Sequence, residues 1–264
     1  MYDIYLYTYY KHRVELFHSL KTIGKYVNYD NLYVVYDDVF YEESDASYVG
    51  PIKWELYEDQ LGDNINIINQ SSLYNWEHQD VMQGWYRQQY CKMLIPTYSK
   101  KRYNIICDGG HTFFIKPYTV FENNIPILYH DTDWPLSDDY FPYIEKYTDR
   151  KVTLSQGTYV GSCSLWDNTI VQNILDTIEN LNGKDFIQCC REHIDNSSGV
   201  REVCFSEFET YGTFAEKQHI VKPYNFQYVT DKKFRPKIKD TTELLIFSDG
   251  FAHCLEEFLS VYGE

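Results

Sequence analysis

The sequence predicts an α/β protein in which a mixed, mostly parallel sheet is flanked by helices in a single domain. Short apolar runs alternate with segments of helical period up to Asp108, in the order strand, helix, strand, strand, helix, strand. Two of the runs end in carboxylates, at Asp37-Asp38 and at Asp108. A length of 264 residues with 44% hydrophobic residues is enough for one large domain with a real core.

The amino-terminal half contains the elements of a doubly wound sheet. Apolar residues from Val14 to Val27 recur at a helical period and predict a helix over 12–27. A second, longer helix is expected over 79–98. The predicted strands are short apolar runs, and they cover residues 4–9, 32–36, 65–68 and 103–107. Helical crossovers between successive strands favour parallel pairing.

The carboxyl-terminal half has a more varied pattern. Its predicted strands cover residues 125–129, 158–165 and 244–247, and the second of these is rich in small residues. Its predicted helices cover residues 138–146, 167–181, a stretch that begins near 206, and 251–262. No internal repeat, low-complexity tract or linker interrupts the chain, so a single domain is the simplest interpretation.

Composition excludes several classes of protein. The net charge of -15 argues against broad nucleic-acid binding, which depends on phosphate neutralisation. No apolar run reaches the length of about 18 residues that a membrane span needs, and the first residues lack the features of a signal peptide. The seven cysteines form no CxxC pair and are expected to be reduced thiols. These observations predict a cytoplasmic protein without a membrane span.

The segment Asp108-Gly-Gly-His111 is the most informative part of the chain. It follows a buried strand, and open α/β sheets bind their ligands at the carboxyl edge of such strands. Asp and His are both metal ligands, and glycines let a phosphate approach the backbone. The alternative is a turn that ends the strand, in which Asp-Gly supplies a positive φ.

Four segments place polar side chains beside apolar elements. They are Gln83–Lys92, Asp108–His111, Gly161–Trp166 and Phe205–Gly212. In this order they resemble little-characterised bacterial and viral glycosyltransferases of the GT-A superfamily, over roughly residues 2–220. In that group a helix carries a Trp…Gln-Gln…Lys pattern, which corresponds here to Trp85, Gln88, Gln89 and Lys92. A later helix begins Ser-Glu-Tyr/Phe-Glu…Tyr-Gly, and the stretch Ser206–Gly212 is the most specific match.

The resemblance implies a GT-A-like fold and a divalent metal that bridges the diphosphate of a sugar nucleotide. The family motif is Asp-x-Asp, whereas this chain has one residue more and a histidine in place of the second carboxylate. Asp108 and His111 are therefore the expected metal ligands, and His219 is a further one, ahead of His253 and His130. Imidazole suits Mn²⁺ better than Mg²⁺, so Mn²⁺ is expected first. A weak metal site and an inactive site are the alternatives.

The donor-binding residues come from helix spacing and topology. Gln88, Gln89 and Lys92 share a helical face, with Lys92 expected at the donor phosphate and the amides at sugar hydroxyls. The alternative is a solvent-facing helix surface. The remaining predicted donor contacts are Thr8, Tyr9, Arg13 and Asp38 (or Asp37) at the nucleotide, Gly109 and Gly110 at the phosphate, and Ser162 at the sugar.

Asp108 and Glu207 are the predicted catalytic residues. Glu207 is expected to act as general base on the acceptor hydroxyl, or to bind that hydroxyl. Because positions i and i+2 lie on different faces of a helix, one of Glu207 and Glu209 is expected to face the cleft and the other the solvent. The competing interpretation is structural: Ser206 caps the helix and Glu209 closes a Ser-x-x-Glu capping box.

The predicted function is a glycosyltransferase that moves a sugar from a nucleoside-diphosphate sugar to a hydroxyl acceptor, with help from Mn²⁺ or Mg²⁺. Residues 1–121 would bind the donor and residues 122–264 would form the acceptor side. The expected acceptor is a glycan or, as viral members of the resembled group suggest, a hydroxylated DNA base. The net charge counts against DNA. A viral protein would act in the host cytoplasm. The alternatives are a nucleotidyltransferase or phosphohydrolase on a similar sheet, and a non-catalytic sugar-nucleotide-binding protein.

Overall fold

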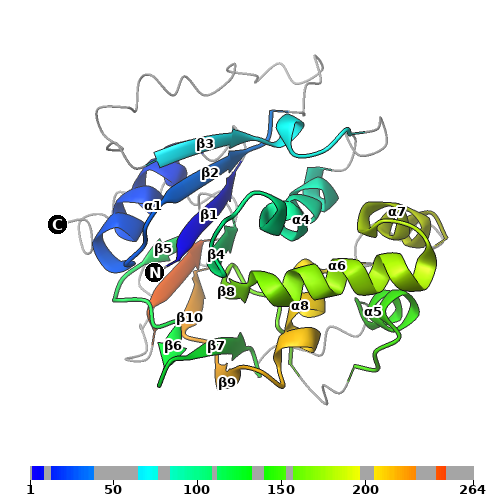
Figure 1. The fold of residues 1–264 in the computed structure, drawn as a ribbon. Coiled ribbons are helices and arrows are strands. Elements are labelled where there is room, and N and C mark those ends of the chain that lie inside the picture. Colours follow the sequence, from blue (N-terminus) through cyan, green and yellow to red (C-terminus); the bar gives the residue numbers. More distant parts are fainter. Residues whose placement is uncertain are drawn as a thin grey trace. The chain divides into compact units, whose positions relative to one another are not determined.

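The computed structural model describes residues 2–8, 13–38, 65–76, 84–108, 112–132, 140–152, 157–196, 205–229 and 242–247 (Figure 1). The chain forms two compact units that alternate along the sequence. Unit 1 consists of Met1–Gly84, Ile105–Thr119 and Asn225–Glu264, and unit 2 consists of Trp85–Asn104 and Val120–Tyr224. The predicted division into a donor-binding half and an acceptor half has, in contrast, a single boundary, after residue 121.

The main sheet of unit 1 is built from buried apolar strands. Strands β1 (Asp3–Thr8), β2 (Leu32–Tyr36) and β3 (Ile65–Asn69) are parallel, with Thr8 opposite Tyr36 and Tyr36 opposite Asn69. Every residue of β1 is buried, as expected for a strand covered on both faces. Strand β4 (Tyr103–Asp108) lies next to β1 in the order β3-β2-β1-β4, and its first two residues belong to unit 2.

A smaller sheet in unit 1 has the order β10-β11-β5. Its strands are β5 (Thr112–Phe114), β10 (Phe226–Val229) and β11 (Leu244–Phe247). Strand β11 is parallel to β10 and antiparallel to β5. Helix α1 (Arg13–Tyr26) packs against β5 (Figure 1).

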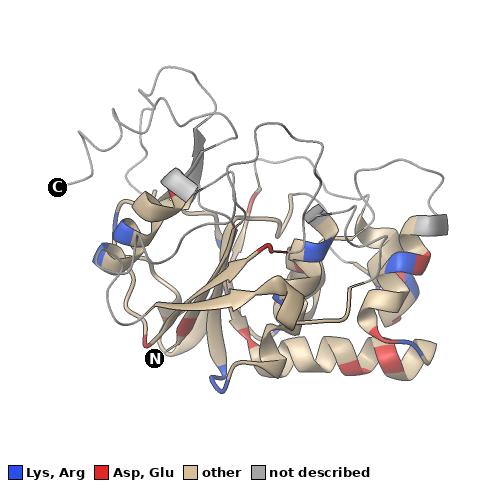
Figure 2. Cartoon of the chain, turned by 90° about the horizontal axis from the view of Figure 1, so that it is seen from above, with Lys and Arg blue, Asp and Glu red and all other residues tan. Residues whose placement is uncertain are grey.

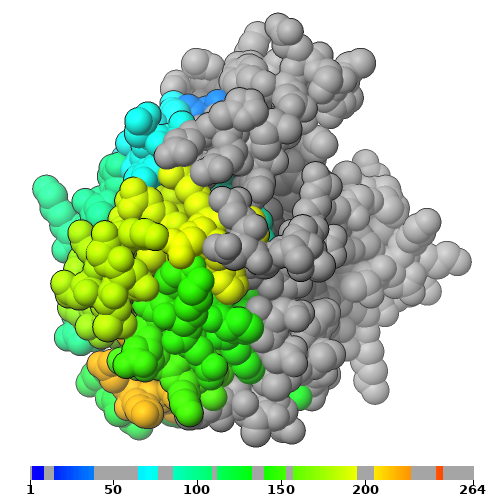
Figure 3. Space-filling view, turned by 90° about the vertical axis from the view of Figure 1, so that its right-hand side faces the viewer, coloured from blue at the N-terminus to red at the C-terminus, as the bar shows by residue number. Residues whose placement is uncertain are grey.

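The helices of unit 2 pack around α6 (Asn168–Asn182), which contacts α5 (Phe141–Thr148), α7 (Phe186–Asn196) and α8 (Glu207–Ala215). Helix α6 buries Ile170, Val171, Ile174 and Ile178. It exposes Asp176 and Glu179, and Figure 2 shows the acidic residues along this helix. In the space-filling view, α5 and α7 meet at the surface of unit 2 (Figure 3).

Unit 2 also contains several short elements. Helix α4 (Gly84–Leu94) continues into a 3-10 turn at Ile95–Thr97, and another such turn, Gln70–Ser72, follows β3 in unit 1. Strands β6 (Phe121–Glu122), β7 (Ile125–His130) and β9 (Ile220–Pro223) form a three-stranded sheet. Strand β8 (Cys163–Asp167) follows β4 in the strand order.

The mixed α/β class with a mostly parallel central sheet, predicted from the sequence, is confirmed. The strand expected over 158–165 is wrong in its bounds: β8 covers Cys163–Asp167, and Thr158 forms only an isolated bridge to Asp131. Helix α7 and strands β5, β6, β9 and β10 were not predicted. The helix predicted over 251–262 and the first part of the helix predicted over 79–98 lie outside the described residues.

Two further observations bear on the class of protein. None of the helices in the described ranges is long and apolar enough to cross a bilayer. Five cysteines of the described part are buried free thiols, namely Cys91, Cys107, Cys163, Cys189 and Cys190.

Candidate functional site

The carboxyl edge of the main sheet in unit 1 collects the ends of three parallel strands. The pairing register places Thr8, Tyr36 and Asn69 side by side, so the residues that follow them share one edge. The Asp37 amide donates to the Thr8 carbonyl at 3.0 Å. Asp38 Oδ1 accepts from the Ser71 amide at 2.9 Å, and Asp38 Oδ2 accepts from Ser71 Oγ at 2.5 Å. These bonds hold the end of β2 to the residues after β3.

Asp108 is the last residue of β4, and its side chain is half-buried. Its carbonyl accepts a hydrogen bond from Thr112 Oγ1 at 2.9 Å. A half-exposed carboxylate at a strand end fits the role of a ligand to a divalent ion, which prefers oxygen donors. Among the other predicted donor and metal residues, Tyr9, Gly109, Gly110 and His111 lie outside the described residues, and so does the side chain of Arg13.

Helix α4 in unit 2 directs two of its predicted donor-binding residues at Glu207. Lys92 Nζ lies 2.5 Å from Glu207 Oε1, and both side chains are almost fully buried. With the Gln89 amide oriented so that its nitrogen is the donor, that nitrogen donates to Glu207 Oε2 at 2.6 Å and to the Phe205 carbonyl at 2.8 Å. The Lys92 ammonium also lies 4.7 Å from the centre of the Phe208 ring. Gln88, in contrast, is half-buried.

These contacts bear on the predicted roles of Glu207 and Lys92. Both carboxylate oxygens of Glu207 are engaged, so neither is presented to an acceptor hydroxyl in this structure. The Lys92 ammonium is likewise held within unit 2, and the residue is 1% exposed. A buried ion pair with additional hydrogen bonds is a costly arrangement that persists only with good geometry, and here it fastens α4 to the start of α8.

The start of α8 decides between the two interpretations of Ser206. Ser206 is the N-cap, and its Oγ accepts from the Glu209 amide at 3.2 Å. The Glu209 carboxylate does not close the capping box, because its Oε2 accepts from Thr158 Oγ1 at 2.7 Å and from the Tyr159 amide at 2.9 Å. The expectation that Glu207 or Glu209 faces solvent is therefore wrong, since both are buried.

Glu209 is an unusual carboxyl group. It is fully buried, and burial raises its pKa to about 7, although hydrogen bonds from Thr158 and from the Tyr159 and Val160 amides oppose that shift. Its Oε1 has no hydrogen-bond partner among the described residues. The carboxyl group therefore ties α8 to the segment before β8 through one oxygen only.

The small-residue segment before β8 is tightly packed. A Cβ on Gly161 would lie 2.2 Å from the Tyr224 hydroxyl oxygen, and a Cβ on Gly157 would lie 2.1 Å from the Asp131 carbonyl oxygen. Tyr224 occupies this space and donates its hydroxyl to the Tyr159 carbonyl at 2.7 Å. Neither glycine therefore has room for a side chain. Ser162, the predicted sugar contact, is buried beside them.

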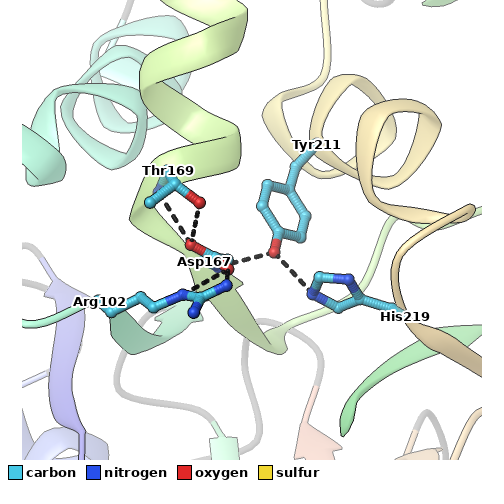
Figure 4. Close-up of polar contacts among 5 residues, drawn as sticks. All are labelled: Arg102, Asp167, Thr169, Tyr211 and His219. Atoms are coloured by element: carbon cyan, nitrogen blue, oxygen red, sulfur yellow. Dashed lines mark hydrogen bonds and ion pairs between the residues drawn. The ribbon is translucent and has the colours of Figure 1, made fainter.

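His219 belongs to a polar network around the end of β8 (Figure 4). Asp167 accepts from Arg102 Nε and Nη2 at 3.0 and 2.9 Å through Oδ2, and it caps α6 through Oδ1, which accepts from the Thr169 amide at 2.9 Å. The Asp167 amide donates to the Tyr211 hydroxyl at 2.7 Å, and that hydroxyl lies 3.1 Å from His219 Nε2. The pKa of His219 is lowered from its ordinary value, and burial is the main cause.

Tyr211 links this network to the most specific sequence motif. Its ring stacks on Trp166 at a centroid distance of 4.7 Å. Next to it, a Cβ on Gly212 would lie 2.2 Å from the Tyr159 ring, and Thr210 Oγ1 donates to the Ser206 carbonyl at 2.7 Å. Each residue of Ser206–Thr210, together with Tyr211 and Gly212, therefore has a packing or hydrogen-bonding role inside unit 2.

Metal ligation was predicted for Asp108, His111 and His219. Asp108 belongs to unit 1, and His219 belongs to unit 2, where its Nε2 faces Tyr211. Within the described ranges, no three His, Cys, Asp or Glu side chains gather in a way that could hold a metal ion. The Arg102–Asp167 and Glu209–Thr158 contacts were not predicted, because their partners are far apart in the sequence.

Comparisons with known proteins give the fold a context. A family model described as "Family of unknown function (DUF6492)" matches residues 10–243. No curated protein matches the chain. Among solved structures, the bifunctional glycosyltransferase WbbM, in its apo form, is 9% identical with a TM-score of 0.53, over 93% of this chain and 45% of that one.

Two structures of the glycosyltransferase GlyE from Streptococcus pneumoniae TIGR4 also match. They are 9% and 10% identical, with TM-scores of 0.45 and 0.46. The matches cover 84% and 94% of this chain, and 45% and 55% of those chains. The chain thus spans about half the length of the proteins it resembles. The similarity to WbbM shows that the chain shares the fold of a glycosyltransferase.

Proposed function

The chain belongs to DUF6492, a family of unknown function, and we propose that it is a glycosyltransferase. It would move a sugar from a nucleoside-diphosphate sugar to a hydroxyl acceptor. A glycan acceptor is favoured over DNA, because the net charge of -15 suits a polyanion poorly.

The observation that carries this proposal is the carboxyl edge of the main sheet in unit 1. Thr8, Asp37 and Asp38 follow or end neighbouring parallel strands there, and Asp108 ends the adjacent strand in the sheet order. Ligands of open α/β sheets bind at this edge. The fold shared with WbbM supports the same class of reaction.

Asp108 and its sequence neighbours would carry the chemistry of transfer. Asp108, with His111, would hold Mn²⁺ or Mg²⁺, which supplies Lewis-acid neutralisation of the leaving diphosphate. Asp38 and Thr8 would contact the nucleotide, and Gly109 and Gly110 would let the phosphates approach the backbone. We give Glu207 no part in the chemistry, because Lys92 and Gln89 engage both of its oxygens.

A thermal-shift panel of nucleoside-diphosphate sugars, with and without Mn²⁺, tests this function. A ligand at a hundredfold excess over its Kd stabilises the folded state by about 2.7 kcal/mol, which is readily measured. The proposal expects a metal-dependent shift with one donor, followed by release of the nucleoside diphosphate when an acceptor is supplied.

Other outcomes identify other functions. Pyrophosphate release from a nucleoside triphosphate would identify a nucleotidyltransferase. A donor that binds and never turns over with any acceptor would identify a binding protein. The absence of a shift with every donor would remove the proposed function.

A further inference from the structure

Strand β5 is the outer strand of the β10-β11-β5 sheet, and it directly follows the Asp108–His111 segment in the sequence. One edge of β5 pairs with β11, with Thr112 opposite Ile246 and Phe114 opposite Leu244. Within the part of the chain that the structure describes, no strand pairs with its other edge. Backbone groups on a buried edge need hydrogen-bond partners, because leaving them without partners costs free energy.

Two hydroxyl groups on α1 supply these partners. Ser19 Oγ donates to the Thr112 carbonyl at 2.5 Å, and the Phe114 amide donates to Thr22 Oγ1 at 3.1 Å. Thr22 Oγ1 in turn donates to the Ser19 carbonyl at 2.9 Å. Ser19 is 0% exposed and Thr22 is 6% exposed. Positions i and i+3 share a helical face, so α1 presents both hydroxyls to the same strand edge.

The chain of contacts continues from Thr112 to Asp108. Thr112 is 0% exposed, and its Oγ1 donates to the Asp108 carbonyl at 2.9 Å. The two ends of the segment Gly109–His111 are therefore joined by a side chain whose own backbone is held by Ser19. An apolar residue at position 19 would leave the buried Thr112 carbonyl without this donor, and one at position 112 would remove the donor to the Asp108 carbonyl.

We propose that Ser19 and Thr112 are positioning residues for Asp108, and that they set where its carboxylate stands at the sheet edge. Neither residue touches a substrate, and they act through the backbone on either side of Gly109–His111. This inference rests on the proposed function for the identity of what Asp108 binds. Substitution of a residue that orients a metal ligand typically weakens metal affinity by about 10–100-fold.

The test titrates the purified full chain and its variants with Mn²⁺ alone and follows free Mn²⁺ by electron paramagnetic resonance. Thr112→Val removes the donor to Asp108 but keeps the branched shape, and Thr112→Ser keeps the hydroxyl. Ser19→Ala removes the donor to Thr112. The control is Thr148→Val in unit 2, which removes a buried hydroxyl that donates to the Ile144 carbonyl at 2.6 Å.

We expect Thr112→Val and Ser19→Ala to weaken Mn²⁺ binding about tenfold or more, with Thr112→Ser and Thr148→Val within about twofold of wild type. Equal affinity in Thr112→Val and Thr148→Val would overturn the proposal. Such a result would mean that the hydrogen bonds of Ser19 and Thr112 stabilise strand β5 without positioning Asp108.

A second measurement can still overturn the inference if the wild type binds no Mn²⁺. That result would count against the proposed metal and not against the hydrogen bonds that link Ser19, Thr112 and Asp108. Hydrogen exchange of peptides that cover residues 105–115 should be faster in Ser19→Ala and Thr112→Val than in wild type and Thr148→Val. Unchanged exchange in both variants would overturn the positioning role.

Discussion

Lys92 Nζ lies 2.5 Å from Glu207 Oε1 in the interior of unit 2, where the two side chains are 2% and 3% exposed. Lys92→Met should destabilise the protein by about 3–5 kcal/mol, because it leaves the Glu207 carboxylate buried without its cation. Urea unfolding measures this loss. The double variant Lys92→Met/Glu207→Gln should recover a large part of it.

The surface pair of Lys184 and Glu192 provides the control for that experiment. Both side chains are well exposed, so Lys184→Met should change the unfolding free energy little. If Lys92→Met were equally mild, the buried pair would not fasten α4 to α8. Any loss of turnover in Glu207→Gln has to be compared with its loss of stability before a catalytic role is assigned.

Glu209 should make the stability of the protein depend on pH. Its folded-state pKa is about 7 against an ordinary value of 4.5, so the folded state binds a proton that the unfolded state has released between these values. The stabilisation is fully present below pH 4.5 and is lost as the pH rises through 7, by an amount of about 3 kcal/mol at most. Urea midpoints at pH 5 and pH 7.5 measure this difference.

Glu209→Gln should flatten that pH dependence, because an amide does not titrate. Glu179→Gln, an exposed change on α6, is the control. A wild-type and a Glu209→Gln protein with the same difference between pH 5 and pH 7.5 would rule out this linkage.

Tyr211→Phe should weaken the network at the end of β8. The change leaves the buried Asp167 amide without its acceptor and removes the contact with His219. The expected cost is about 1–3 kcal/mol, as measured by chemical denaturation. Tyr98→Phe, at a residue with 43% exposure, should stay within about 0.5 kcal/mol of wild type. Similar values for the two variants would contradict a supporting role for the Tyr211 hydroxyl.

The glycines of the segment before β8 should differ sharply from the glycine in α1. Gly157 has φ of 80°, and a Cβ there would meet the Asp131 backbone at 2.1 Å, so Gly157→Ala should cost more than about 1 kcal/mol. A Cβ on Gly24 would meet no atom within 4 Å, so Gly24→Ala should stabilise α1 by about 0.5–1 kcal/mol. Melting temperatures of the two variants should therefore move in opposite directions.

Asp108→Asn tests the proposed function most directly. It removes the ligand charge at the end of β4 and should weaken Mn²⁺ binding more than Thr112→Val or Ser19→Ala does, because it changes the ligand itself and not a residue that positions it. Metal-dependent donor binding and turnover should be lost with it, while circular dichroism shows an intact fold. Asp176→Asn, on the exposed face of α6, is the matched control. Wild-type turnover in Asp108→Asn would place the chemistry elsewhere.

Much of the fold could be predicted because local patterns carry it. The apolar runs of β1 and β2 and the helical period of α1 and α6 reflect burial that neighbouring residues share. Helix α7 was missed although Phe186, Ile187, Cys189, Cys190 and Ile194 have helical spacing. Polar residues interrupt that period, and two cysteines stand near the centre of the helix. Strand β5 has only three residues, too few to show any period.

The candidate site was less predictable because its contacts join distant residues. Lys92 and Glu207 are 115 positions apart, and Thr158 and Glu209 are 51 positions apart. The Ser206 N-cap, one of the two interpretations of the segment Ser206–Gly212, is confirmed. The partners that explain its glutamates, Lys92 and Thr158, could be assigned only from three-dimensional packing. The roles of Ser19 and Thr22 could not be predicted either, because their partners Thr112 and Phe114 lie 93 and 92 positions further along the chain.

The alternation of the two units along the chain limits how this protein can change in evolution. The backbone passes between unit 1 and unit 2 after Gly84, Asn104, Thr119 and Tyr224. No single crossover would therefore exchange one whole unit and leave the other intact. A relative that kept unit 1 and acquired a different unit 2 would need exchange at several points, or substitutions and loop insertions within unit 2.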